Sequence, residues 1–200
     1  FGRVPSPTDD APHSIFVNAA DSNPLAADPA KVLTGRDADF VAGLQVVSKL
    51  SGGKTYVCKA AGANIPTGDA KVTVEEFAGP HPSGTVGYHI HTLDPVDRNR
   101  CVWHLNYQDV VAVGRLFETG RLDVERVVAL GGPGVRSPRL LRTRQGAELG
   151  PIVDGQLEGD HNRVVSGSVL FGRTAMGDVE GFLGRYHLQV SALEEGDKRE

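Results

Sequence analysis

The segment Ser14-Ile-Phe-Val-Asn-Ala-Ala-Asp21 is a short apolar run that leads directly into the turn Ser22-Asn-Pro24. An apolar run of this length, bounded by a turn, predicts a buried β-strand. Residues 37–50 follow with apolar side chains at close to helical spacing, and a second strand is expected at residues 55–58. A strand, a helix and a second strand in this order indicate an α/β layer whose strands run mostly parallel.

The same alternation continues to about residue 132. A third strand is expected at residues 72–77, where the prolines of Gly79-Pro-His-Pro82 end it. Residues 108–119 again have helical spacing and are closed by Gly120. We predict a further strand at residues 125–131 and count it with the parallel layer.

The character of the sequence changes after the glycine-rich loop Gly131-Gly-Pro-Gly134. Short β-rich pieces alternate with glycine-rich turns, and only residues 147–152 suggest a helical turn. We therefore predict a small α+β domain over residues 136–200, preceded by an α/β domain over residues 1–135. The expected β-rich pieces are residues 139–143, 163–166 and 186–190.

Composition limits the class of protein. The 200-residue chain has 40% hydrophobic residues and can bury a core of its own, and its net charge of -4 gives no reason to expect a nucleic-acid partner. Cys58 and Cys101 are too few for a disulfide scaffold. No run approaches the roughly 18 apolar residues of a membrane-spanning helix, so we expect a protein that is soluble or peripheral to a membrane. Because the chain starts at Phe1 and ends in the charged residues 194–200, we expect a piece of a longer polypeptide.

Histidines gather in one part of the chain. If the two histidines of His89-Ile-His91 lie on a strand, their side chains share a face. A third zinc ligand could then come from the Cys101-Val-Trp-His104 step, with His81 nearby. This spacing is not diagnostic of zinc. In the alternative, the histidines hydrogen-bond within their loop and pack beside Tyr88 and Trp103.

Two loops fall where an α/β protein could bind a ligand. Gly131-Gly-Pro-Gly134 suggests a phosphate cradle, but its glycines do not follow the G-x-G-x-x-G pattern and no helix is expected after it. Asp21-Ser-Asn23 ends the first strand, at the edge where such a sheet binds ligands, although these are also ordinary turn residues. The sequence contains no nucleophile elbow, Walker loop or H-E-x-x-H motif, so we predict no catalytic residue and no metal site.

A basic cluster surrounds Leu140-Leu141. Its members are Arg136, Arg139, Arg142 and Arg144. We interpret it as a solvated strand face, or else as a docking surface for an acidic partner.

Several segments, taken together, form a specific pattern that extends in order along nearly the whole chain. They are Asp21-Ser-Asn-Pro-Leu-Ala-Ala27, Gly79-Pro-His-Pro82, Gly87-Tyr-His-Ile-His-Thr-Leu-Asp-Pro-Val96, Trp103-His-Leu-Asn-Tyr-Gln-Asp-Val-Val111, Pro138-Arg-Leu-Leu-Arg-Thr143, Val165-Ser-Gly-Ser-Val-Leu170 and Leu183-Gly-Arg-Tyr-His-Leu-Gln-Val190. These segments closely resemble the NqrA family, which supplies one subunit of the bacterial Na+-translocating NADH:quinone reductases.

The resemblance implies an α/β fold, with a Rossmann-like, mostly parallel sheet, followed by a small α+β domain of the β-grasp, soluble-ligand-binding (SLBB) kind. That family is also similar to the NADH-binding flavoprotein subunit of respiratory complex I and to the RnfC subunit. In those flavoproteins a glycine-rich loop holds FMN and cysteines hold an iron-sulfur cluster. Here the loop Asp21-Ser-Asn-Pro-Leu25 has no glycine, and no cysteine set for a cluster is present. We therefore expect no cofactor bound by this chain, although the complex uses NAD(H), flavins and quinone.

The resemblance also implies a peripheral subunit on the cytoplasmic face of the bacterial inner membrane, associated with the other subunits of the reductase and with ubiquinone. We predict a scaffold without catalysis of its own that contributes to assembly and to a quinone site. A quinone head group needs hydrogen-bond donors and a flat apolar wall. The predicted contacts are His89, His91, Trp103, His104 and Tyr107, and the opening Phe1-Gly-Arg-Val-Pro5 is another candidate contact.

The alternative function is a ligand-binding α/β module that retains affinity for a nucleotide or a flavin. Flavin absorbance in the purified protein distinguishes the two hypotheses, because a cofactor-free scaffold is colourless.

Overall fold

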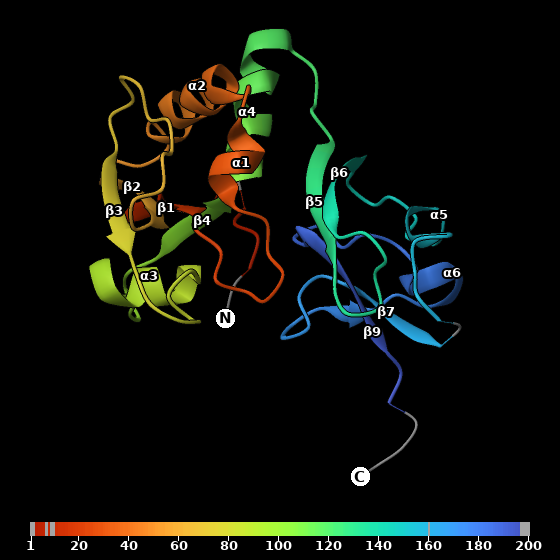
Figure 1. The fold of residues 1–200 in the computed structure, drawn as a ribbon. Coiled ribbons are helices and arrows are strands. Elements are labelled where there is room, and N and C mark those ends of the chain that lie inside the picture. Colours follow the sequence, from red (N-terminus) through yellow and green to blue (C-terminus); the bar gives the residue numbers. More distant parts are fainter. Residues whose placement is uncertain (1–2, 7, 9–10, 160, 197–200) are drawn as a thin grey trace. The chain divides into compact units, whose positions relative to one another are not determined.

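The computed structural model describes residues 3–6, 8, 11–159 and 161–196. Phe1 and Gly2 of the proposed opening contact therefore lie outside the described residues. By their internal contacts the described residues form two compact units. The first joins the residues up to Ala20 to Leu33–Leu122, and the second joins Asp21–Val32 to the residues from Asp123 onward. Each unit contains one sheet (Figure 1), and the predicted order of a parallel α/β layer followed by a mixed sheet is confirmed.

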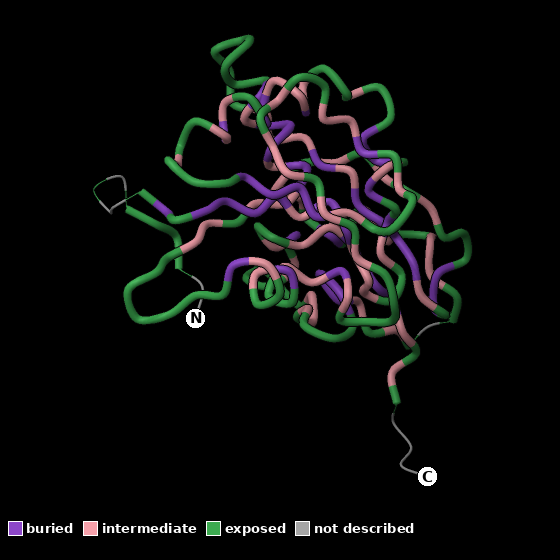
Figure 2. Tube along the Cα trace, turned by 90° about the vertical axis from the view of Figure 1, so that its left-hand side faces the viewer, coloured by how far each residue is buried: buried purple, intermediate pink, exposed green. Residues whose placement is uncertain are grey.

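The first sheet has its strands in the order β3-β2-β1-β4, and all of its neighbours are parallel. Its strands are β1 (Ser14–Ala19), β2 (Thr55–Ala60), β3 (Thr73–Phe77) and β4 (Val102–Asn106). β1 lies inside the sheet because burial of its apolar side chains is favourable, and Ile15, Phe16 and Val17 are fully buried. Figure 2 shows buried stretches in the interior of the trace and exposed ones mainly in its outer turns. Three of these strands are predicted from the sequence, whereas β4 is not.

The helices associated with this sheet are α2 (Asp37–Val47), α3 (Val86–Leu93) and α4 (Tyr107–Thr119). The short helix α1 (Pro29–Leu33) belongs, except for Leu33, to the second unit. α2 and α4 pack together on one face, and α3 covers the other (Figure 1). α2 and α4 can approach so closely because glycines lie at their crossing: a Cβ on Gly43 would lie 2.0 Å from the carbonyl oxygen of Val110. The side chain of Asn106 accepts hydrogen bonds from the backbone amides of Gln108 and Asp109 in the first turn of α4. Gly120 ends that helix with a φ of 68°.

No helix in the described part of the chain is both long enough and apolar enough to cross a membrane.

The second sheet is mixed, in the order β6-β5-β9-β7-β8. Its elements are β5 (Glu125–Gly131), β6 (Arg139–Arg144), α5 (Gly150–Val153), β7 (Asn162–Ser166), β8 (Arg173–Thr174), α6 (Gly177–Glu180) and β9 (Gln189–Glu194). One face carries an apolar core in which Val128, Leu130, Leu149 and Val190 are almost fully buried. The core of this unit is therefore separate from that beneath α3.

The assignment of residues 125–131 to the parallel layer is wrong. β5 pairs antiparallel with β6 and parallel with β9, and both partners come later in the chain. The strand itself is correctly predicted, but an apolar run does not reveal which strand it will pair with, because pairing is a long-range choice. Residue 135 is the predicted boundary between the two domains, and this boundary stays a prediction. β5 precedes it, whereas its partners β6 and β9 both follow it.

Candidate functional site

The carboxyl ends of parallel strands mark the edge where an α/β sheet binds ligands. In the loop after β1, Asp21 Oδ1 accepts the backbone amide of Asn23 at 2.9 Å and its side-chain amide at 2.6 Å. Gln189 on β9 donates to the carbonyl oxygen of Pro24 at 3.0 Å. These bonds maintain the shape of the loop itself, and the loop has no glycine that would let a backbone amide approach a pyrophosphate. The residues present therefore do not fit the phosphate of a dinucleotide or a flavin.

The loop Gly131-Gly-Pro-Gly134 forms a tight turn that leads from β5 towards β6, with no helix after it. Gly132 has a φ of 123°, and a Cβ there would lie 2.2 Å from the carbonyl oxygen of Ala192. A Cβ on Gly134 would lie 2.2 Å from Oδ1 of Asn162. These glycines are required for close packing against neighbouring strands, which explains them without a bound phosphate.

The assignment of His89 and His91 to one face of a strand is wrong, because both residues lie in α3. Side chains two residues apart on an α-helix are separated by roughly 200° around its axis, so they point to different sides. His89 is fully buried, whereas His91 is exposed. Within the described residues, no group of three or more His, Cys, Asp or Glu side chains could hold a metal ion. The hypothetical zinc site is therefore not formed.

His89 is held in the core against the end of β3. Its Nε2 donates to the carbonyl oxygen of Ser83 at 2.7 Å, and the centroids of its ring and the Phe77 ring are 4.0 Å apart. Because Nε2 carries the proton, Nδ1 is an acceptor, and this buried atom has no hydrogen-bond partner among the described residues. Burial lowers the pKa of His89, so the ring is neutral at pH 7. His89 thus hydrogen-bonds to the loop before α3, and its ring contacts Phe77 and Tyr88, whereas the alternative placed it in a loop beside Tyr88 and Trp103.

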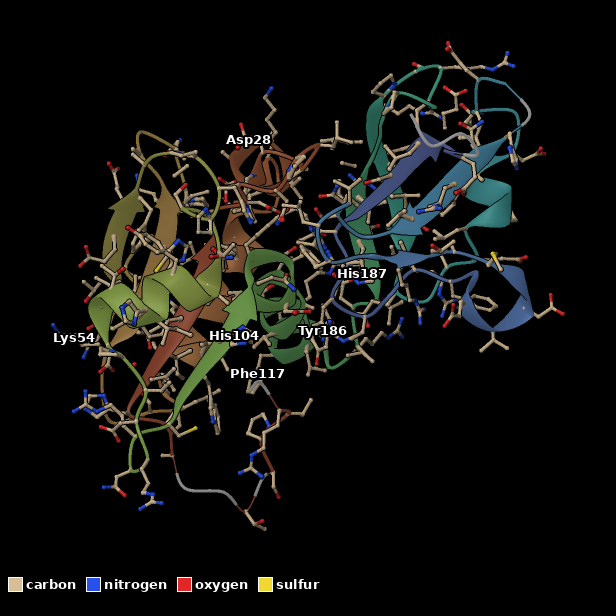
Figure 3. The ribbon with its side chains drawn as sticks, turned by 90° about the horizontal axis from the view of Figure 1, so that it is seen from below. Asp28, Lys54, His104, Phe117, Tyr186 and His187 are labelled. Carbon is tan, nitrogen blue, oxygen red and sulfur yellow. The ribbon has the colours of Figure 1, made fainter. Side chains whose placement is uncertain are left out.

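Trp103 and His104 are neighbours on β4, and their side chains therefore point to opposite faces of the sheet. Trp103 is in register with Ile15 and His104 with Phe16, so His104 lies on the face that α3 covers. His104 is exposed at the edge of the sheet (Figure 3), although desolvation by the protein around its ring lowers its pKa. Tyr107, at the start of α4, is buried.

The five predicted quinone contacts consequently do not meet in one pocket. His89 and Tyr107 are enclosed, whereas His91, His104 and part of Trp103 can be reached from outside. A shallow depression of about 650 Å³ lies in the second unit and contains none of them. Its lining residues are Gly150, Pro151, Val153, Asp154, Gly155, Leu157 and Gly159.

Asp94 is the centre of a polar cluster that the sequence pattern does not reveal. Its Oδ2 accepts from Ser14 Oγ at 2.6 Å and lies 2.6 Å from His13 Nδ1, and its Oδ1 accepts from Arg100 at 3.1 Å. Burial alone raises the pKa of Asp94, but the hydrogen bonds from Ser14 and His13 and the charge of Arg100 outweigh it and hold the pKa below its usual value. The ionised carboxylate ties the start of β1 to the end of α3, away from the ligand-binding edge.

A second polar pair, Ser166 and His187, lies in the second unit. Ser166 Oγ is buried, accepts the amide of Gly184 at 3.0 Å and lies 2.8 Å from His187 Nδ1. The His187 ring is wedged between glycines, since a Cβ would come within 3.0 Å of it on Gly167 and within 2.4 Å on Gly184. Burial and the charge of Arg173 lower the pKa of His187. In the sequence, the signal for this pair is glycine at positions 167 and 184, because these two residues leave room for the His187 ring.

Three members of the basic cluster around Leu140-Leu141, namely Arg139, Arg142 and Arg144, lie on β6 at one edge of the second sheet, and Arg136 precedes that strand. Arg139 donates to the side chain of Gln156 at 2.8 Å, and Arg142 forms an ion pair with Glu125 at 3.2 Å. These local partners favour the interpretation as a solvated strand face.

Comparison with known proteins covers both units. The family model described as the NqrA second alpha/beta domain matches residues 1–122, and the model described as the NQRA C-terminal domain matches residues 127–177. The whole chain is 54% identical to the NqrA subunit of the Na(+)-translocating NADH-quinone reductase of Pasteurella multocida and 56% identical to that of Hahella chejuensis. It covers 45% and 44% of these two proteins, so it spans less than half of their length.

A solved structure shares the fold at low sequence identity. An NAD+-reducing [NiFe]-hydrogenase in its H2-reduced state superposes on 92% of this chain, and on 41% of its own, with a TM-score of 0.65 at 17% identity. This likeness shows the fold alone. Together with the sequence matches, it confirms the expected fold class and the family resemblance: the chain belongs to the NqrA family of the Na+-translocating NADH:quinone reductases, within the second α/β domain and the C-terminal domain of that subunit.

Proposed function

We propose that this chain is the part of a peripheral NqrA subunit that docks on the other subunits of a Na+-translocating NADH:quinone reductase at the cytoplasmic face of the bacterial inner membrane. The observation that carries the proposal is identity above one half over the whole chain to proteins named as this subunit. In this role the chain positions partners and carries no redox cofactor of its own. The loop after β1 supports that role, because it has no glycine and the carboxylate of Asp21 accepts both the backbone amide and the side-chain amide of Asn23.

The assembly prediction can be tested in the complete complex. An NqrA subunit containing this segment should co-purify with the complex when the affinity tag is placed on another subunit. A variant of that subunit that lacks the segment corresponding to residues 1–200 of this chain should not be retained. If the deleted form is retained as well as the intact one, the docking role is contradicted.

We further propose that the chain contributes to a quinone site through the side chains that a ligand can reach on β4 and α3. The ring of His104 offers an N–H group to a quinone carbonyl, whereas Trp103 points to the opposite face of the sheet and takes no part in this contact. His89 and Tyr107 are too deeply buried to touch a ligand, so in this proposal they position α3 and α4.

A calorimetric titration of the chain with a short-chain ubiquinone tests this second proposal. Saturable binding is expected, weakened about fivefold by His104→Ala, since a lost hydrogen bond is worth about 1 kcal/mol. His161→Ala, which removes an exposed histidine of the second unit, serves as the control and should leave binding unchanged. Absence of saturable binding, or an equal effect of both substitutions, would rule out a quinone contact at His104.

A further inference from the structure

Helix α3 has a single buried side chain, that of His89, and its other residues are half-buried or exposed. His89 Nε2 donates to the carbonyl oxygen of Ser83 in the loop that precedes the helix. The centroid of its ring lies 4.0 Å from that of Phe77 on β3. We name residues 79–93, which comprise this loop and α3, the His89 cover. The position of the start of the cover therefore depends on the His89 ring.

The site of the His89 ring accepts only the neutral form. A protonated ring carries N–H groups on both nitrogens, but Nδ1 is enclosed and has no hydrogen-bond partner among the described residues. His89 also follows the N-cap Thr85 by four residues, where the positive end of the helix dipole disfavours another positive charge. Burial lowers the pKa of His89 and outweighs the opposite effect of the hydrogen bond to Ser83.

The titratable groups on the elements that pack with the cover do not compensate a charge on His89. Glu75 lies on the sheet face beneath α3, but no ion pair joins it to His89 in the described part of the chain. Burial raises the pKa of Tyr56 and of Cys58 on β2, so both are neutral at and below pH 7. Burial also lowers the pKa of His104 on β4. The remaining titratable groups of these elements and their ends are Lys54, His81, Tyr88, His91 and Asp94.

The other end of the cover is held by a carboxylate whose ionised form is stable to lower pH. Asp94 accepts from Ser14 at 2.6 Å and from Arg100 at 3.1 Å. Burial acts to raise the pKa of Asp94, but hydrogen bonds from Ser14 and His13 outweigh it and lower the pKa. Asp94 therefore stabilises the fold fully above about pH 4, the ordinary value for aspartate, whereas neutral His89 does so fully only above about pH 6.5. Between these two pH values only the start of the cover loses stability.

We propose that the His89 cover is an acid-released lid: below about pH 6.5, protonation of His89 detaches the loop and the first turn of α3 from the sheet, while Asp94 keeps the end of α3 in place. Opening breaks the hydrogen bond of 3.2 Å from Asn18 Nδ2 to the carbonyl oxygen of Gly84 and exposes Cys58 beneath the helix. The opposite face of the sheet stays closed, because α2 and α4 contain no histidine. This inference does not rest on the proposed function.

The reactivity of Cys58 measures the opening. Cys58 is fully buried under the cover, and a Cys101→Ser background removes the exposed thiol. The probe is dithiodipyridine, which reacts with thiols in acid, and its rate on the folded 200-residue chain is divided by its rate on the urea-unfolded chain at the same pH. This ratio should rise about tenfold or more between pH 7 and pH 5, because opening takes up one proton. Trp103 fluorescence should stay native, which distinguishes local opening from unfolding of the first unit.

His89→Gln, made in the Cys101→Ser chain, tests the assignment to this ring. Its side-chain amide can donate to Ser83 but takes up no proton, so the ratio should no longer depend on pH. The matched controls His91→Gln, at an exposed position on the same helix, and His104→Gln, on β4, should keep the dependence. A ratio that does not change with pH in the parent chain, or the same dependence in His89→Gln, overturns the lid.

Hydrogen exchange of the wild-type chain gives the answer if His89→Gln does not fold. The backbone amides of Tyr88 and His89, which donate to Thr85, should lose protection between pH 7 and pH 5. The amide of Asp94, which donates to Ile90, should keep its protection. Equal protection of the first turn at the two pH values, or an equal loss at both ends of the helix, overturns the proposal.

Discussion

Gly114→Ala is expected to destabilise the first unit by at least about 3 kcal/mol, because the new methyl group has no space in the crossing of α2 and α4. A Cβ at this position would lie 1.9 Å from the carbonyl oxygen of Asp39 and 2.8 Å from the amide nitrogen of Gly43. Both neighbours are backbone atoms, so no rotamer change relieves the clash and the helices must separate. Trp103, the single tryptophan of the chain, lies on β4 of this unit, and its fluorescence during urea unfolding measures the loss.

Gly87→Ala is the matched control, since it places the same methyl group in helix α3 with no atom within 4 Å. Relief of glycine's excess flexibility should there raise the free energy of unfolding by about 0.5–1 kcal/mol. A Gly114→Ala protein that unfolds within about 0.5 kcal/mol of the wild type would show that α2 and α4 are not in backbone contact.

Phe16→Ala is expected to cost about 3–5 kcal/mol, since it removes a fully buried aromatic ring from the centre of the sheet. The ring stacks on Tyr56 with centroids 4.9 Å apart and belongs to the apolar cluster on which α3 packs. The cavity should loosen α3 and admit water to His89, whose pKa would then rise toward its ordinary value. Urea unfolding followed by Trp103 fluorescence measures the stability, and an NMR titration of the histidine rings measures the pKa.

Phe16→Leu provides the comparison, because it keeps the site apolar and loses less volume. Its cost should fall near or below about 1.5 kcal/mol, with the pKa of His89 close to that of the wild type. Equal stability of the Ala variant and the wild-type protein would contradict the position of Phe16 beneath α3.

Local pattern predicts most of the elements of this chain. β1, α2, β2 and α4 are expected from their apolar spacing, because burial of one face imposes that spacing on the sequence. β4 escapes prediction because it is a half-buried edge strand whose residues mix apolar and polar types without a clear period. β5 is found as a strand but counted with the wrong sheet, since its partners β6 and β9 come after the change in sequence character near residue 132.

The candidate site shows the same division. The resemblance directs attention to His89, His91 and His104, and the family assignment that it implies is confirmed. A two-residue spacing nevertheless has opposite meanings on a strand and on a helix, and α3 separates the two histidines that a strand would bring together. The Asp94 cluster and the pair of Ser166 with His187 join residues about 80 and 21 positions apart, so no local window contains them.

The sequence by itself determined the fold class, the family and the absence of a glycine-rich loop after the first strand, because these depend on residue type and on spacing within a few turns of chain. Only the tertiary structure decided which sheet receives β5, which histidines are buried and which distant residues surround Asp94. Those properties depend on contacts between residues far apart in the chain. Such contacts contribute to stability only after the chain segments between their residues have folded and brought them together.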